Sequence, residues 1–289
     1  MYFDEDLVLE LRLNLLDKYV DYFVIVESKY NHKGESKKLN FNIQNYKKFE
    51  KKIIYLVFDQ EPSDLYKFEK KDTQADISSK YIFNAGKREN GQRNFISRGL
   101  KDAKSDDIII ISDVDEIPNL AGINFNTIKN EIIIFRHEMF YYKFNLKLPH
   151  YKWTGSKACK MKNLKSPQWL RNIKDKKFGF YRIDTFFSDT KYRNLIIVDN
   201  GGWHYTNIKT AKEIEYKLRS YLHHHEFDIN PLSLEQIENI IKDRKAIYNL
   251  ELDQRQNKFG NGPPLIKIEL GEIPDYLKNN PDIFNKWLD

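Results

Sequence analysis

The sequence predicts an α/β protein with a mainly parallel central sheet. Apolar runs of strand length recur through the first half of the chain, and helix-like or long segments separate them. Runs that are apolar on both faces suit strands buried inside a mainly parallel sheet, and such connections join parallel strands by right-handed crossovers. The composition agrees with a folded domain, because 40% of the 289 residues are hydrophobic and 14% are aromatic.

An amphipathic helix and two strands open the chain. Residues 5–18 place Leu7, Leu11 and Leu15 at helical spacing with charged residues between them, which predicts an amphipathic helix. Tyr22–Glu27 (YFVIVE) and Ile53–Phe58 (IIYLVF) are continuous apolar runs of similar length. We predict that both are buried strands.

The middle of the chain contains the clearest strand. Gly91–Lys104 has apolar residues at positions that favour a helix, and Asp107–Asp113 (DIIIISD) and Glu131–Phe135 follow as strands. Open α/β sheets bind ligands beyond the carboxyl ends of their strands. Glu27 and Asp113 stand at the ends of their strands, so we expect both at that edge.

The second half is less regular. Phe140–Arg193 gives no clear pattern, Leu195–Val198 predicts a short strand, and Asn200–His204, with two glycines, predicts a turn. The proline-rich tail beyond Gly260 is expected to be extended and packed on the surface. Two capping-box signatures predict helix starts, one at Thr210 with Glu213 and one at Ser233 with Gln236.

Basic residues are concentrated in two stretches. The chain has 48 Lys and Arg against 42 Asp and Glu, a formal charge of +6. Residues 29–52 hold eight lysines against two glutamates, and residues 157–182 hold nine Lys or Arg against one aspartate. Such stretches attract an anionic partner, which is a nucleic acid, an acidic membrane surface or a phosphorylated small molecule. The alternative is a solvated basic surface with no partner.

The cysteine content and the hydropathy indicate in which cellular compartment the protein is expected. Cys159 is the only cysteine, so an internal disulfide is excluded and a reducing compartment is favoured. No apolar run approaches the roughly 20 residues that span a bilayer, and residues 1–6 are acidic rather than a basic lead into an apolar segment. We therefore expect a cytoplasmic protein without a transmembrane segment.

The strongest local signal is an acidic motif after four isoleucines. Asp113 and Asp115 are separated by one residue at the end of a predicted buried strand. This places two carboxylates in one crevice, an arrangement that a bound divalent cation makes favourable. One alternative is that the aspartates only begin a loop. Another is a phosphatase of the haloacid-dehalogenase type, which favours an N-terminal motif followed by a small residue or threonine rather than by Glu116-Ile117-Pro118.

Three other polar features are candidates for a site. His204 follows two glycines and Trp203 and is either a metal ligand or structural. The adjacent histidines of His223–Glu226 point in different directions on a helix, so we expect them to cap a helix C-terminus on the surface. Arg93 is suited either to a bound diphosphate or to a buried carboxylate.

These segments together resemble glycosyltransferase family 17. The resemblance runs from about Leu7 to Tyr205 and is strongest at the acidic motif. The order of the matching segments along the chain is more specific for the family than any single segment. The matching segments are Leu7–Lys18, Tyr22–Ser28, Gly34–Leu39, Gln92-Arg93, Ser112–Pro118, Ser166–Arg171 and Gly201–His204.

The resemblance implies a GT-A type, Rossmann-like nucleotide-sugar-binding fold and an inverting transfer from a UDP-sugar, most often UDP-N-acetylglucosamine, with Mn²⁺ or Mg²⁺. Asp113 and Asp115 would hold the metal and the donor, and His204 would complete the metal shell. Glu27 would lie near the nucleoside, and Arg93 would belong to the donor site. The acceptor would be a hydroxyl of a glycan or glycolipid.

The sequence contains no internal repeat and no linker of the kind that separates domains, so we predict one domain over residues 1–289. It divides into a donor-binding half (1–136), a less regular acceptor half (137–259) and a C-terminal tail (260–289). An inverting transfer needs a carboxylate that takes the acceptor proton. Asp184 is our candidate, with Glu116 and Glu226 as rivals.

A nucleic-acid-binding protein that uses basic and aromatic residues is the competing class. An acidic cluster at the most recognisable motif disfavours it, so no nucleic-acid partner is expected. The basic stretches remain compatible with peripheral contact to a membrane.

Overall fold

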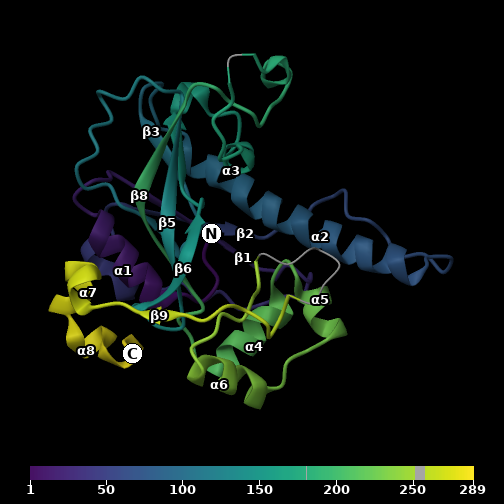
Figure 1. The fold of residues 1–289 in the computed structure, drawn as a ribbon. Coiled ribbons are helices and arrows are strands. Elements are labelled where there is room, and N and C mark those ends of the chain that lie inside the picture. Colours follow the sequence, from purple (N-terminus) through teal and green to yellow (C-terminus); the bar gives the residue numbers. More distant parts are fainter. Residues whose placement is uncertain (180, 251–257) are drawn as a thin grey trace.

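The computed structural model describes residues 1–179, 181–250 and 258–289, and these form an α/β fold. Its helices lie around a tall sheet (Figure 1). The helices are α1 (Asp6–Leu16), α2 (Gln74–Asn94), α3 (Pro167–Asn172), α4 (Ala211–Ser220), α5 (His224–Ile229), α6 (Leu234–Lys242), α7 (Asp275–Asn279) and α8 (Pro281–Phe284). The strands are β1 (Phe23–Ser28), β2 (Ile53–Phe58), β3 (Ile108–Ile111), β4 (Glu116–Pro118), β5 (Ile132–Tyr141), β6 (Leu146–Trp153), β7 (Lys157–Lys160), β8 (Leu195–Thr206) and β9 (Ile266–Lys267).

The strands form two sheets. β1 and β2 pair in parallel as a sheet of their own. In the larger sheet, β5 pairs in parallel with β8 and antiparallel with β6 and β7, and the pairs β3–β7, β4–β8 and β6–β9 are also antiparallel. The prediction of strands was confirmed, but the prediction of a mainly parallel central sheet was wrong. An isoleucine run records burial on both faces, and covered antiparallel strands show the same pattern.

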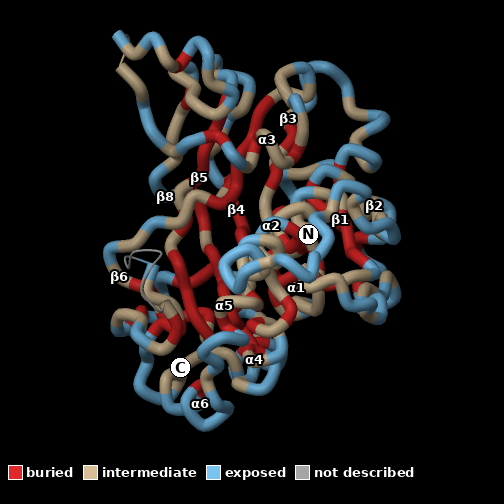
Figure 2. The backbone as a smooth tube through the Cα atoms, turned by 90° about the vertical axis from the view of Figure 1, so that its right-hand side faces the viewer, coloured by how far each residue is buried: buried red, intermediate tan, exposed pale blue. Residues whose placement is uncertain are grey.

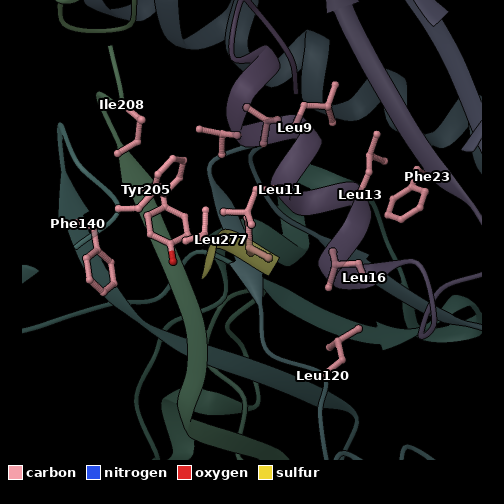
Figure 3. Packing of buried hydrophobic residues seen from close by; sticks show 14 of the residues in the cluster. Leu9, Leu11, Leu13, Leu16, Phe23, Leu120, Phe140, Tyr205, Ile208 and Leu277 are labelled. Atoms are coloured by element: carbon pink, nitrogen blue, oxygen red, sulfur yellow. The ribbon is translucent and has the colours of Figure 1, made fainter. Parts of the chain in front are cut away.

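The N-terminal helix and the C-terminal tail share one hydrophobic cluster. The predicted helix is present as α1, but of the three leucines at helical spacing only Leu11 is buried, whereas Leu7 and Leu15 are partly buried. Leu9, Leu13 and Leu16 are buried as well, so the buried face is broader than the spacing predicted. Leu277 of α7 lies beside the leucines of α1 in the same cluster (Figure 3). The prediction of an extended tail was therefore wrong from residue 270 onward, whereas residues 261–269 contain β9 and no helix. Pro274 precedes α7, and Pro281 occupies the first turn of α8, where its missing N–H costs nothing, so these two prolines mark helix starts.

The helix predicted over residues 91–104 begins much earlier. α2 starts at Gln74, where Thr73 and Asp76 form a capping box, and a 3₁₀ turn over Phe95–Leu100 follows it. The buried residues of α2 include Asn84, Gln92 and Arg93. Because polar residues fill part of its buried face, the helix lacks the apolar periodicity that reveals a helix in a sequence.

The predicted turn at Asn200–His204 lies inside strand β8. The register between β5 and β8 shifts at this point, so the glycines occupy a bulge rather than a chain reversal. Gly202 has φ +132°, and a Cβ added there would lie 2.1 Å from the carbonyl oxygen of Ile117. The glycine therefore allows β4 to approach β8 closely, which places His204 opposite Glu116.

A small helical layer covers the second half of the sheet. The capping boxes at Thr210 and Ser233 open α4 and α6, as predicted. The prediction for His223–Glu226 was wrong, because α5 begins at His224 and this histidine is 1% exposed. Buried residues follow β4, β5 and β8, whereas much of α6 is exposed (Figure 2). In the described ranges, no helix is both long and apolar enough to cross a membrane.

Candidate functional site

The acidic motif lies between β3 and β4 and faces a pocket. The pocket is formed by the N-terminal segment, the loop after β1, α2 and the C-terminal part of α4. Among its lining residues are Tyr2, Phe3, Ser28, Asn31, His32, Lys37, Glu89, Gln92, Asp113, Asp115, Lys217 and Tyr221. The chain thus brings together side chains that are separated by more than half its length.

Two arginines hold the carboxylate of Asp113. One guanidinium nitrogen of Arg93 lies 3.2 Å from Oδ1, and one of Arg171 lies 3.2 Å from Oδ2. Burial raises the pKa of Asp113, but the charges of Arg93 and Arg171 outweigh burial and hold its pKa well below the usual range. Asp113 is therefore an ionised carboxylate that is paired with two guanidinium groups.

Asp115 faces a histidine and a lysine. Its Oδ2 lies 3.6 Å from Nε2 of His204 and 3.8 Å from Nζ of Lys217. Burial raises the pKa of Asp115, but interactions with His204 and Lys217 outweigh burial and lower the pKa to about 2. Its carbonyl accepts a 2.8 Å hydrogen bond from the backbone N–H of Tyr205, which ties the acidic loop to β8.

His204 has one ring nitrogen toward Asp115 and one in the protein interior. The imidazole lies against the ring of Trp153, with centroids 5.0 Å apart, and its Nδ1 is buried without a hydrogen-bond partner. A carboxylate oxygen and an imidazole nitrogen are ligands that suit Mn²⁺ or Mg²⁺. In the described part of the chain, no three His, Cys, Asp or Glu side chains are already grouped as metal ligands. Asp113 instead pairs with Arg93 and Arg171.

Glu116 organises the centre of this region. Its carboxylate accepts hydrogen bonds from Nε1 of Trp153 at 2.6 Å, from Arg171 at 2.6 and 2.9 Å, and from the backbone N–H of Asp113 at 2.9 Å. The residue is 1% exposed. A Cβ at Gly155 would lie 2.1 Å from its carboxylate carbon, so the glycine makes room for this carboxylate.

Arg171 and Arg12 contribute to the site, although we did not predict either. Arg171 lies on α3 and contacts both Asp113 and Glu116. Arg12 extends from α1 and donates to the carbonyl of Glu116 at 2.6 Å and to Oγ of Ser112 at 2.7 Å. In the sequence, Arg12 resembles an ordinary surface charge of an amphipathic helix. Arg171 lies in a segment that belongs to the family resemblance, but no sequence pattern in that segment singles out this arginine.

Glu27 is buried behind the pocket. It is 0% exposed and accepts hydrogen bonds from Lys37 at 2.6 Å, from the backbone N–H of Asn40 at 2.7 Å and from Tyr55 at 2.9 Å. The pocket itself is lined by its neighbour Ser28 and by Lys37. Glu27 therefore fixes the loop that carries Lys37, and its role toward a nucleoside stays a prediction.

Two of the carboxylates considered as proton acceptors lie outside this group. Asp184 pairs with Arg182 at 2.7 Å and with Lys191 at 2.6 Å, all within residues 174–193, and does not line the pocket. Glu226 of α5 pairs with His223 at 3.1 Å. Among the predicted site residues, the structure brings Arg93, Asp113, Asp115, Glu116 and His204 together.

The comparison with known families gives a match over nearly the whole chain. The model of Glycosyltransferase family 17 matches residues 1–287. No curated protein and no solved structure matches the chain.

Proposed function

The chain belongs to glycosyltransferase family 17, and from this premise we propose that it transfers a sugar, N-acetylglucosamine in the first instance, from a UDP-sugar to a hydroxyl of a glycan acceptor. We further propose that the transfer inverts the anomeric centre, that it uses Mn²⁺ or Mg²⁺, and that the fold is of the GT-A type. The observation that carries the proposal is the pair Asp113 and Asp115 at the wall of a pocket with cationic neighbours.

The charges of the pocket suit a nucleotide diphosphate. Lys217 and Lys37 both line it, and Arg93 lies directly behind Asp113. A diphosphate brings negative charge into a site that already holds two ionised aspartates. Binding is favourable only when cations offset that charge, which the lysines do in part.

Asp115 and His204 are the residues that would hold the divalent cation. Their ligand atoms lie 3.6 Å apart and are of the types that Mn²⁺ accepts. When bound, the cation supplies positive charge against the departing diphosphate. Asp113, held by Arg93 and Arg171, would then orient the donor ribose by accepting hydrogen bonds from its hydroxyl groups.

The reaction is a single displacement. The acceptor oxygen forms a bond to the anomeric carbon from the face opposite the diphosphate, and the bond from that carbon to the phosphate oxygen breaks as UDP leaves. The acceptor proton passes to a carboxylate. Asp184, Glu116 and Glu226 are the candidates for this proton acceptor, and the position of Asp184 outside the pocket leads us to expect that it is not the one.

A screen of donor hydrolysis tests the proposal. The purified chain would be incubated with UDP-, GDP- and dTDP-sugars, with Mn²⁺ or with a chelator, and released nucleotide would be measured. We expect release from a UDP-sugar in the presence of Mn²⁺ and its loss in Asp115→Asn. Equal release by Asp115→Asn, or release only from a donor of another nucleotide, would contradict it.

A further inference from the structure

The loop between α3 and β8 presents the most exposed large hydrophobic side chains of the described chain. Tyr181 is 72% exposed, Ile183 70%, Phe186 73% and Phe187 87%. All four lie within seven residues, and none belongs to the three hydrophobic clusters of the described residues. A group of large apolar side chains in water marks a surface that binds a partner.

Hydrogen bonds connect the described residues of this loop, 174–179 and 181–193, to one another. The backbone N–H of Lys174 donates to the carbonyl of Thr190 at 2.8 Å and closes its base. Arg193 donates to Oγ1 of Thr185 at 2.8 Å and to the carbonyl of Arg182 at 2.6 Å. These hydrogen bonds direct polar groups inward. The exposure of the aromatic side chains is therefore a property of the folded loop.

The loop is attached firmly to the sheet and projects beyond it. Arg136 of β5 pairs with Asp175 at 3.1 Å, and Nε1 of Trp169 on α3 donates to the carbonyl of Asp189 at 2.8 Å. In Figure 1 the segment after α3 projects at the top of the view, away from the helical layer of α4–α6. These two contacts join the loop to β5 and α3, and its projection away from α4–α6 suits contact with a flat partner.

Positive charge surrounds the exposed side chains. Residues 174–193 contain six Lys or Arg against three Asp. Lys174, Lys176 and Lys177 are exposed, and Arg193 lies over the ring of Phe186, 4.3 Å from its centroid. Aromatic side chains partition into the headgroup region of a bilayer, and neighbouring lysines are attracted to anionic headgroups. The chemistry of the loop thus matches an acidic membrane surface.

We propose that residues 174–193 bind the surface of an anionic lipid bilayer, with Phe186 and Phe187 inserted at the level of the headgroups. The loop joins α3, which carries Arg171, to β8, which carries His204. Binding through this loop therefore docks the site-bearing elements at the membrane. The proposal does not depend on the sugar donor or on the metal.

Vesicle binding by the full chain tests this proposal. Sedimentation with vesicles of phosphatidylcholine plus phosphatidylserine would be compared with phosphatidylcholine alone, at low and high salt. We expect binding to the mixed vesicles that weakens with salt. The double variant Phe186→Ser/Phe187→Ser should reduce the affinity for mixed vesicles about tenfold or more. The double variant Lys176→Ser/Lys177→Ser should reduce the affinity for mixed vesicles roughly tenfold.

Two controls make the result specific. Phe83→Ser removes another aromatic, 58% exposed on α2, and should leave vesicle binding unchanged. Phe187→Trp should show a blue shift of tryptophan emission with mixed vesicles, a readout that does not need the double variant to fold. Three outcomes would overturn the proposal: no vesicle binding, equal binding by the double phenylalanine variant, or self-association through these phenylalanines without binding to lipid.

Discussion

The guanidinium of Arg171 holds the carboxylate of Glu116 through two hydrogen bonds of 2.6 and 2.9 Å. The same arginine reaches Asp113, so α3 links the loop that carries the acidic motif to the core of the site. Burial lowers the pKa of Arg171, but the charges of Glu116 and Asp113 outweigh burial and raise it. Arg171 is therefore the central cation of the site.

Removing this cation is expected to destabilise the fold. Arg171→Met leaves the buried Glu116 carboxylate without its main partner, and we expect a loss of about 3–5 kcal/mol in the free energy of unfolding. Urea denaturation followed by circular dichroism measures it. Arg98→Met, on an exposed arginine, is the matched control and should stay near wild type. A loss below about 1 kcal/mol for Arg171→Met would show that the ion pair is not a structural element.

The bulge in β8 gives a second stability test. Gly202→Ala combines an unfavourable φ of +132° with a Cβ that would contact the Ile117 carbonyl, and we expect a loss on the order of 3 kcal/mol. Gly271→Ala, where a Cβ would have open space, should change stability by about 0.5 kcal/mol or less. Equal stability of the two variants in denaturant would refute the close approach of β4 to β8.

Lys157 predicts a pH dependence of stability. Burial, followed by the charge of Arg171, lowers its pKa to about 8, whereas an unfolded lysine titrates near 10.4. Between these values the unfolded chain binds more protons than the folded chain, so this lysine makes stability rise with pH there, by about 3 kcal/mol. Denaturation curves at several pH values, compared with Lys157→Met, should show the rise only in wild type. The same pH dependence of stability in wild type and in Lys157→Met would contradict this prediction.

The candidates for the proton acceptor can be separated by kinetics. Asp184 lies in ion pairs within the loop of residues 174–193 and does not line the pocket. We therefore expect Asp184→Asn to keep transfer activity within about threefold of wild type, since loss of a general base costs roughly 10²–10⁴-fold in rate. A loss of that size in kcat, with unchanged donor KM and an unchanged unfolding midpoint, would restore Asp184 as the base.

The sequence predicted the parts of the site that local chemistry marks. An isoleucine run followed by two aspartates defines both a strand and its polar end, and the structure has β3 followed by Asp113 and Asp115. Capping boxes are equally local, and both predicted boxes are present. Signals of this kind depend on neighbouring residues alone, so tertiary packing did not alter them.

The features that the sequence did not predict depend on long-range contacts. Strand direction in the large sheet is set by pairing between distant segments, such as β5 with β8, and leaves no mark on an apolar run. Arg12 reaches Glu116 across 104 positions, which no spacing rule records. The glycines before His204 were assigned to a turn because glycine indicates both turns and bulges.

Calorimetry of UDP binding tests the central claim most directly. UDP would be titrated into wild type with Mn²⁺, into wild type with a chelator, and into Asp115→Asn with Mn²⁺. If Asp115 and His204 hold a cation that binds the diphosphate, affinity should fall at least about tenfold in the second and third titrations. The same UDP affinity in all three would contradict a metal-dependent donor site at the acidic motif.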